Sequence, residues 1–216
     1  LAKKIDGEII NADSMQVYKE LKILSARPSF KDYRNIKHHL YGFHNVKKNF
    51  STGDWLKLSL RKVAEIKKRK KIPILVGGTG LYFKAIQEGL VKIPNIPIRF
   101  RGKIRQLHKS LGQNIFYKKL LELDPKSKNK INPTDSQRSI RAFEVKKFTN
   151  KSIHDWYQNT IPVYENKDFF KIYLNFPRDQ LISKITSRTE NMIKIGAIRE
   201  VEKFVKLKVK KDRSVN

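Results

Sequence analysis

The 216-residue chain contains no cysteine and comparatively few acidic residues. Without cysteine, a disulfide framework and cysteine-ligated metal sites are excluded, and nothing argues for secretion. No apolar run approaches the roughly 20 residues that a membrane span needs, and no signal peptide opens the chain. His38, His39 and His44 lack the further ligands that a zinc site would need. We therefore expect a cytoplasmic protein that has no membrane partner.

The scarcity of acidic residues leaves a formal net charge of +28, from 48 Lys and Arg against 20 Asp and Glu. Such an excess predicts a polyanionic partner, either nucleic acid or an anionic membrane surface. Lysine, isoleucine and asparagine are all plentiful, so an AT-rich genome explains much of the charge equally well. The stretch 99–130 carries ten cations against Glu122 and Asp124, which makes it the best candidate for a phosphate-tracking surface.

Strand and helix patterns alternate at both ends of the chain, as in an α/β fold. Strands are expected at 8–12, 72–76 and 169–176, and helices at 56–67, 81–88, 178–195 and 197–208. Between them, Pro94 and Pro97 mark a linker into a purely helical region. Its helices are expected near 99–111, 115–123, 125–131, 136–149 and 152–157. We predict an α/β core over 1–92 and 161–216 and an all-helical insertion over 93–160.

Polar and glycine residues directly follow the first and second predicted strands. Asp13 comes just after 8–12, and Gly77-Gly78-Thr79-Gly80 separates 72–76 from the next helix. Ligands of α/β sheets bind at the carboxyl ends of strands. A carboxylate there can accept a proton or hold an amine, and a glycine turn before a helix can receive a phosphate. The alternatives are a helix N-cap or loop aspartate, and an ordinary tight turn.

Basic residues with helical spacing form two further candidate sites. Arg138 and Arg141 share a helix face and suit phosphate or base-edge contacts, and Glu144 can pair with Arg141. Lys184 and Arg188 are four residues apart and could clamp a diphosphate. The alternative for both pairs is a solvated, salt-bridged surface.

Seven stretches occur in an order and spacing that is highly specific, although each alone is a weak signal. They are GEIINADSMQVYKELKILSARPS at 7–29, HHLYGF at 38–43, FSTGDW at 50–55, IPILVGGTGLYFKAIQEGL at 72–90, INPTDSQRSIRAFEV at 131–145, TNKSIHDW at 149–156, and R-x-x-x-M-x-x-x-G from Arg188 to Gly196, continued by EVEKF at 200–204. Together they resemble the tRNA dimethylallyltransferase (tRNA isopentenyltransferase) family.

The resemblance implies a P-loop NTPase-like parallel-sheet core with a helical insertion that grips tRNA. It implies transfer of a dimethylallyl group from dimethylallyl diphosphate to N6 of the adenosine 3′ to the anticodon in tRNA. It also implies Mg²⁺ as cofactor and the tRNA anticodon stem-loop as partner, and we expect a monomer.

The family's functional residues carry over onto matching positions of this chain. The resemblance makes Asp13 the residue that binds and deprotonates the adenine N6 amine, Thr79 the residue that positions the diphosphate, and Arg188 a residue that binds its charge. Gly77 and Gly78 would line the diphosphate site beside Thr79. Contacts to tRNA would come from Asp13, Ser14, Met15, Gln16, Arg101, Gln137, Arg138, Ser139, Ile140 and Arg141.

The chain departs from the family pattern at its ends. The family's P-loop, which cradles the diphosphate and helps hold Mg²⁺, is expected before Leu1, and the last part of the core after Asn216. The chain is therefore expected to be an inactive fragment of an active enzyme. Two smaller departures are Lys184, where the family often has arginine, and Leu24-Ser25-Ala26-Arg27, which replaces a Gly-Thr-Ala-Lys-like stretch. Two alternatives stay open: prenylation of free adenine nucleotides, and a non-catalytic basic RNA-binding module.

Overall fold

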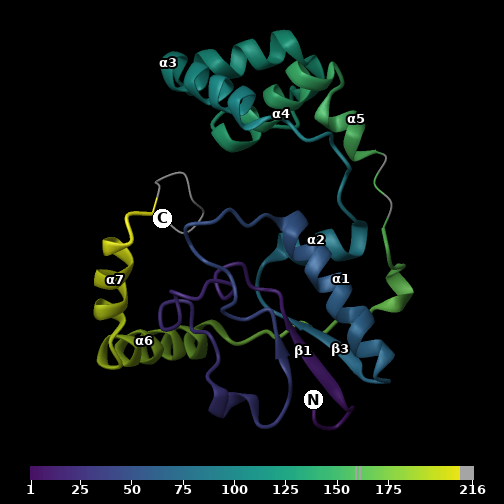
Figure 1. Ribbon diagram of the computed structural model, residues 1–216. Helices are drawn as coiled ribbons and strands as arrows, with labels where there is room; N and C mark the ends of the chain where they lie inside the picture. Colours follow the sequence, from purple (N-terminus) through teal and green to yellow (C-terminus); the bar gives the residue numbers. More distant parts are fainter. Residues whose placement is uncertain (159, 161, 210–216) are drawn as a thin grey trace. The chain divides into compact units, whose positions relative to one another are not determined.

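The structure is a computed structural model that describes residues 1–158, 160 and 162–209 (Figure 1). Residue 159 of the expected insertion and residues 161 and 210–216 of the expected core lie outside the described residues. The chain divides into two compact units. We call residues 1–87 and 164–216 the core unit, and residues 88–163 the helical unit. The insertion expected at 93–160 falls within the helical unit.

The core unit contains a three-stranded parallel sheet. β1 (Gly7–Asn11) lies between β2 (His38–His39) and β3 (Ile72–Val76). Ile9 of β1 pairs with His38 on one side and with Ile74 on the other. Parallel pairing places the carboxyl ends of β1 and β3 at the same edge, where ligands bind in α/β sheets. The predicted α/β fold is confirmed, although the two-residue strand β2 was not predicted.

Two helices join the end of β1 through one buried tryptophan. α1 (Thr52–Lys68) starts with a capping box, in which the Ser51 hydroxyl and the Asp54 carboxylate each accept the other residue's amide. Trp55 of α1 is fully buried and stacks on Tyr82 of α2 (Gly80–Glu88), with ring centroids 4.2 Å apart. Its indole N–H donates to the Asn11 carbonyl at 2.8 Å. The tryptophan therefore fixes both helices against the strand end that precedes Asp13.

The helical unit has its own apolar core. α3 (Ile98–Leu123) is interrupted at Gly112, whose φ of +72° is not helical, in agreement with the two helices predicted there. η2 (Pro125–Ser127), α4 (Ser136–Thr149) and α5 (Ile153–Tyr157) follow. The fully buried side chains of this core are Phe116, Leu120, Ala142 and Val145. The helix expected at 125–131 is reduced to the short turn η2.

The strand predicted at 169–176 is wrong. After the short helix η3 (Asn166–Asp168), the chain runs without strand pairing to α6 (Arg178–Lys194). A strand needs a neighbour for its backbone hydrogen bonds, and 169–176 pairs with no described strand. Phe170 and Tyr173 are accordingly about nine-tenths exposed, at 92 % and 89 %. The apolar pattern at 169–176 is present in the sequence, but the segment forms no strand in the structure.

The described chain ends with a helix that packs on the loops after β1. α7 (Ala197–Lys206) follows α6 at Gly196, whose φ of +107° permits the sharp change of direction. Phe204 and Leu207 pack against the buried Val17 and Leu21, in the region that also contains η1 (Phe30–Tyr33). None of the described helices combines the length and apolar character that a membrane span needs.

A buried carboxylate joins three elements of the core unit. Glu8 of β1 is only 2 % exposed, and its Oε2 lies 2.7 Å from Nε2 of His39 in β2 and 2.7 Å from Nη2 of Arg69, which follows α1. Burial raises the pKa of Glu8, but the hydrogen bonds from Arg69 and His39 outweigh it and hold that pKa below its usual value. The ionised carboxylate therefore contributes stability that is lost as the pH falls through the lowered pKa.

We expect Glu8→Gln to lower the free energy of unfolding of the core unit by about 1–3 kcal/mol, because it removes one acceptor and the charge opposite Arg69. Urea denaturation followed by Trp55 fluorescence in a Trp156→Phe background measures this. Glu65→Gln on the exposed side of α1 is the matched control, with an expected loss below about 1 kcal/mol. Equal losses in the two variants would contradict the prediction.

The helical unit should lose stability in mild acid because of His154. Burial and the charge of Lys130 lower the pKa of His154 below its usual 6.5, against the opposing charges of Asp124 and Asp155. Its Nε2 lies 3.3 Å from the Ser127 hydroxyl. Below about pH 6.5 the unfolded chain binds the His154 proton more readily than the folded one. The free energy of unfolding of the helical unit therefore decreases as the pH is lowered.

The measurement is hydrogen exchange of α4 and α5 between pH 7.5 and 5.5, corrected for the intrinsic pH dependence of exchange. Protection should decrease toward pH 5.5 in the natural sequence and change much less in a His154→Gln variant. A pH profile that is the same in both proteins would refute the role of His154.

Candidate active site

The side chain of Asn11 shapes the loop that leaves β1. Asn11 is fully buried; its Oδ1 accepts the amide of Asp13 at 2.9 Å, and its Nδ2 donates to the carbonyls of Asp13 at 2.9 Å and of Leu40 at 3.0 Å. A single amide side chain thus satisfies both backbone groups of Asp13. The position of Asp13 is therefore set by the end of the sheet.

The carboxylate of Asp13 is oriented by the backbone that follows it. Its Oδ1 accepts hydrogen bonds from the amides of Met15 at 2.8 Å and Gln16 at 3.3 Å. Within the described chain, its Oδ2 accepts no hydrogen bond, and the residue is only partly buried. The arrangement leaves one carboxylate oxygen able to take a proton from a bound group.

Thr79 joins the end of β3 to the end of β1. Its amide donates to the Ala12 carbonyl at 3.2 Å, its Oγ1 accepts the Ser14 amide at 2.9 Å, and the hydroxyls of Thr79 and Ser14 lie 3.3 Å apart. The structure therefore brings Thr79 to Asp13 and Ser14, although Thr79 lies 65 residues after Ser14 in the sequence.

The glycines beside Thr79 differ in what surrounds them. A Cβ on Gly77 would overlap the carbonyl of Ala12, so only glycine permits this approach of the two strands. A Cβ on Gly78 or Gly80 would meet open space, and α2 begins at Gly80. Exposed backbone at the start of a nine-residue helix offers amides to an anion. The turn thus combines a structural glycine with an open approach for a phosphate.

Two tyrosines near Asp13 were not singled out from the sequence. Burial, with the nearby Tyr33 and Asp13, raises the pKa of Tyr41 to about 12. Burial also raises the pKa of Tyr82 above its usual range, and the charge of Asp13 adds to this effect. Both phenols therefore stay protonated at neutral pH. Tyr41 lies in the HHLYGF stretch, which is the signal that could have identified it.

Arg188 is not brought to this cluster. It lies on α6, whose residues are exposed almost throughout, and within the described chain no contact joins its side chain to Asp13 or Thr79. Lys184 on the same helix lies over the ring of Phe176, 4.5 Å from its centroid. Their expected action on a diphosphate stays a prediction.

The loop residues expected to contact tRNA lie just after Asp13. Ser14 bonds to Thr79, while the Gln16 amide nitrogen donates to the carbonyls of Ser25 at 3.0 Å and Ala26 at 3.3 Å. Met15 lines an apolar cavity next to α7. The side chain of Gln16 therefore holds the loop to the turn around Ser25.

Three arginines surround one buried carboxylate in the helical unit. The Glu144 side chain is 1 % exposed; its Oε2 lies 3.2 Å from Arg101 Nε and 3.6 Å from Arg141 Nη1, and its Oε1 lies 4.0 Å from Arg105 Nε. The predicted pairing of Glu144 with Arg141 is confirmed, but sequence spacing could not place Arg101 or Arg105 there. The partly exposed guanidinium groups form a surface with excess positive charge, which suits phosphates.

The other residues expected to contact tRNA differ in exposure. Gln137 is exposed, and Arg138 is exposed but 3.1 Å from Asp135 in an ion pair. Ser139 is fully buried and its hydroxyl lies 3.2 Å from the Gln113 amide nitrogen, while Ile140 packs against the helical core. Gln137 and Arg138 are thus the members of this group that a partner can reach directly.

The donor set of the site does not match a complete metal site. Among the described residues, no three His, Asp or Glu side chains gather around a point that could hold a metal ion. The carboxylate of Asp13 and the hydroxyls of Ser14 and Thr79 are too few ligands for Mg²⁺ without further oxygens. A bound Mg²⁺ would therefore need oxygen ligands in addition to these.

A parallel α/β sheet with a carboxylate and a glycine-threonine turn at neighbouring strand ends defines a ligand-binding α/β protein. The sequence matches the IPP transferase family over residues 16–215, and the chain belongs to this family. The expected P-loop NTPase-like fold class is confirmed by the solved structures to which the chain is similar.

The relatives are tRNA-modifying enzymes by name. The chain is 58% identical to the tRNA dimethylallyltransferase of Pelagibacter ubique, covering 100% of this chain and 69% of that protein. It is 42% identical to the enzyme of the same name from Rickettsia massiliae, covering 98% of this chain and 59% of that protein. The chain thus spans about three-fifths to two-thirds of the length of these curated relatives.

Two solved structures share the fold. The tRNA isopentenylpyrophosphate transferase of Bacillus halodurans aligns with a TM-score of 0.63 and 30% identity, covering 99% of this chain and 66% of that one. A eukaryotic dimethylallyltransferase acting on tRNA aligns with a TM-score of 0.82 and 24% identity, covering 99% and 53%.

We expect Gly77→Ala to separate the ends of β1 and β3 and to lower the free energy of unfolding by about 1–3 kcal/mol, because the added methyl overlaps the Ala12 carbonyl. Gly78→Ala is the matched control, since its methyl meets open space. Urea denaturation followed by Trp55 fluorescence in the Trp156→Phe background compares them. A Gly77→Ala variant as stable as the Gly78→Ala variant would show that the strand ends are not in such close contact.

Proposed function

We propose that this protein transfers a dimethylallyl group from dimethylallyl diphosphate to N6 of the adenosine 3′ to the anticodon in tRNA. The observation that carries the proposal is the carboxylate of Asp13, held with one oxygen available on a loop whose next residue, Ser14, bonds to the hydroxyl of Thr79. The names of the relatives support the same reaction. We further propose that the protein acts as a monomer in the cytoplasm, on the anticodon stem-loop.

In the proposed reaction, N6 of the adenine forms a bond to the terminal carbon of the dimethylallyl group, and the bond from that carbon to the diphosphate oxygen breaks. The electron pair leaves with the diphosphate. The N6 proton passes to Oδ2 of Asp13, which raises the nucleophilicity of a weakly nucleophilic aromatic amine. The adenine must leave its base stack to reach Asp13, at a cost of a few kcal/mol.

Negative charge builds on the departing diphosphate. We assign its binding to the turn at Gly77, Gly78 and Thr79, where exposed backbone precedes α2, with Arg188 as a further cation. The Thr79 hydroxyl already bonds to Ser14, so it ties the diphosphate side of the site to the loop that carries Asp13.

The helical unit favours tRNA over a free nucleotide as the acceptor. Residues 93–160 carry 15 Lys and Arg against 5 Asp and Glu. The Arg101, Arg105 and Arg141 guanidiniums around Glu144 are held in place, which lowers the entropy lost when they bind phosphates. AMP carries a single phosphate, whereas tRNA presents a run of phosphates to such a surface. Efficient prenylation of AMP by the full-length gene product would refute the tRNA assignment.

We expect Asp13→Asn to slow prenyl transfer at least about a hundredfold, because the amide cannot take the N6 proton. Affinity for an anticodon stem-loop should stay within about twofold of the natural protein, since a neutral isostere keeps the loop shape. The measurements are transfer of labelled dimethylallyl from its diphosphate to tRNA, and stem-loop binding by fluorescence anisotropy, both on the full-length gene product.

The matched control is Asp6→Asn, which makes the same change of charge at an exposed position outside the site. Asp6 has φ of +48°, a conformation that asparagine also adopts. Full transfer activity in the Asp13→Asn variant would exclude Asp13 as the base. Binding of tRNA without any transfer by the natural protein would instead favour a non-catalytic RNA-binding module.

A further inference from the structure

The carboxylate of Glu200 on α7 binds three consecutive backbone amides from a distant part of the chain. Its Oε2 accepts from the amides of Lys22 at 3.0 Å and Ile23 at 2.9 Å, and its Oε1 accepts from Ile23 at 3.0 Å and Leu24 at 2.9 Å. Hydrogen bonds to an ionised acceptor are roughly twice as strong as neutral ones. One side chain therefore fixes the conformation of the whole turn.

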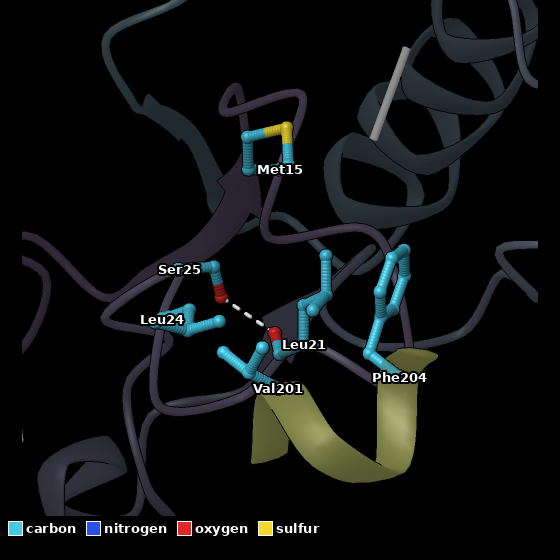
Figure 2. Close-up of a pocket in the computed structure, with 6 residues that line it drawn as sticks. All are labelled: Met15, Leu21, Leu24, Ser25, Val201 and Phe204. Atoms are coloured by element: carbon cyan, nitrogen blue, oxygen red, sulfur yellow. Dashed lines mark hydrogen bonds between the residues drawn. The ribbon is translucent and has the colours of Figure 1, made fainter. Parts of the chain in front are cut away.

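Apolar contacts beside Glu200 hold α7 against the same turn. Figure 2 shows Val201 and Phe204 of α7 facing Leu21 and Leu24. These side chains, with Met15 and Ser25, line a cavity of about 180 Å³. The hydrogen bonds of Glu200 and these apolar contacts together hold the turn against α7.

The turn at 22–26, which Glu200 binds, also holds the loop that follows Asp13. The Ser25 hydroxyl donates to the Leu21 carbonyl at 2.6 Å, which closes the turn (Figure 2). The carbonyls of Ser25 and Ala26 accept the side-chain amide of Gln16. A continuous set of hydrogen bonds thus runs from Glu200 through residues 22–26 to Gln16.

We propose that Glu200 is a positioning residue for RNA binding: it fixes the turn at 22–26, which holds Gln16 and thereby the loop Ser14–Gln16. The inference rests on the proposed function. Asp13 itself is placed by Asn11, and its neighbour Ser14 by Thr79, independently of Glu200. Loss of the Glu200 contacts therefore affects how the RNA is held more than how the proton is taken.

The test is Glu200→Gln in the full-length gene product, assayed for prenyl transfer to an anticodon stem-loop. The amide keeps one acceptor oxygen and presents an NH₂ group to amides that are themselves donors. We expect the KM for the stem-loop to rise about tenfold, which corresponds to the loss of about 1.4 kcal/mol. We expect kcat and the KM for dimethylallyl diphosphate to stay within about twofold.

Glu202→Gln is the matched control. It removes the same negative charge two residues further along α7, at an exposed position that makes no hydrogen bond or ion pair with the described residues. A general increase in attraction to RNA would appear equally in both variants. The proposed role requires the KM for the stem-loop to rise in Glu200→Gln alone.

Equal KM values for the stem-loop in the two variants would overturn the inference. A lower melting temperature of Glu200→Gln with an unchanged KM would also overturn it, because Glu200 would then have a purely structural role. Should Glu200→Gln fail to fold, Glu200→Asp provides the same readout, since it keeps the charge but shortens the reach to the amides. If the natural protein transfers no prenyl group, the proposed function fails. The inference is then decided by the stem-loop Kd, which must rise about tenfold in the Glu200 variants only.

Discussion

The close approach of two parallel strand ends determines the geometry of the candidate active site. The backbone of Gly77 lies against Ala12, and Thr79 bonds to both Ala12 and Ser14. Trp55 donates to the last carbonyl of β1, so α1 and α2 are attached at the same point. A shift of β3 away from β1 would displace the threonine, the glycine turn and both helices together. The backbone of Asp13 and Ser14 is thus attached to the ends of both strands.

Acidic residues are scarce in this chain, and three of them hold distant segments together. Glu8 joins two strands to the end of α1, Glu144 holds arginines from α3 and α4, and Glu200 holds a backbone turn. Each is surrounded by cations or amide donors, which balance the negative charge of its carboxylate. The large positive charge of the protein is therefore arranged around a small number of anionic contacts.

Local signals predicted the elements that position the site, while contacts between distant residues were not predictable. The helix expected at 56–67 corresponds to α1, the two helices expected at 99–111 and 115–123 to the interrupted α3, and the strand expected at 72–76 to β3. The rule that ligands bind at strand carboxyl ends pointed separately to Asp13 and to the turn at 77–80, and the pairing of β1 with β3 brings the two together in the structure. The strand expected at 169–176 failed because an apolar run does not specify its pairing partner. Arg101 with Glu144, and Glu200 with residues 22–24, depend on how the helices pack, which spacing along the chain does not encode.

The contact of Glu200 also has a consequence for where anions bind. Three successive amides that point toward one spot form a concave site that would attract a phosphate. Here the protein's own carboxylate already occupies it. A phosphate would have to displace that carboxylate and would meet its charge, so the turn at 22–24 discriminates against the sugar–phosphate chain.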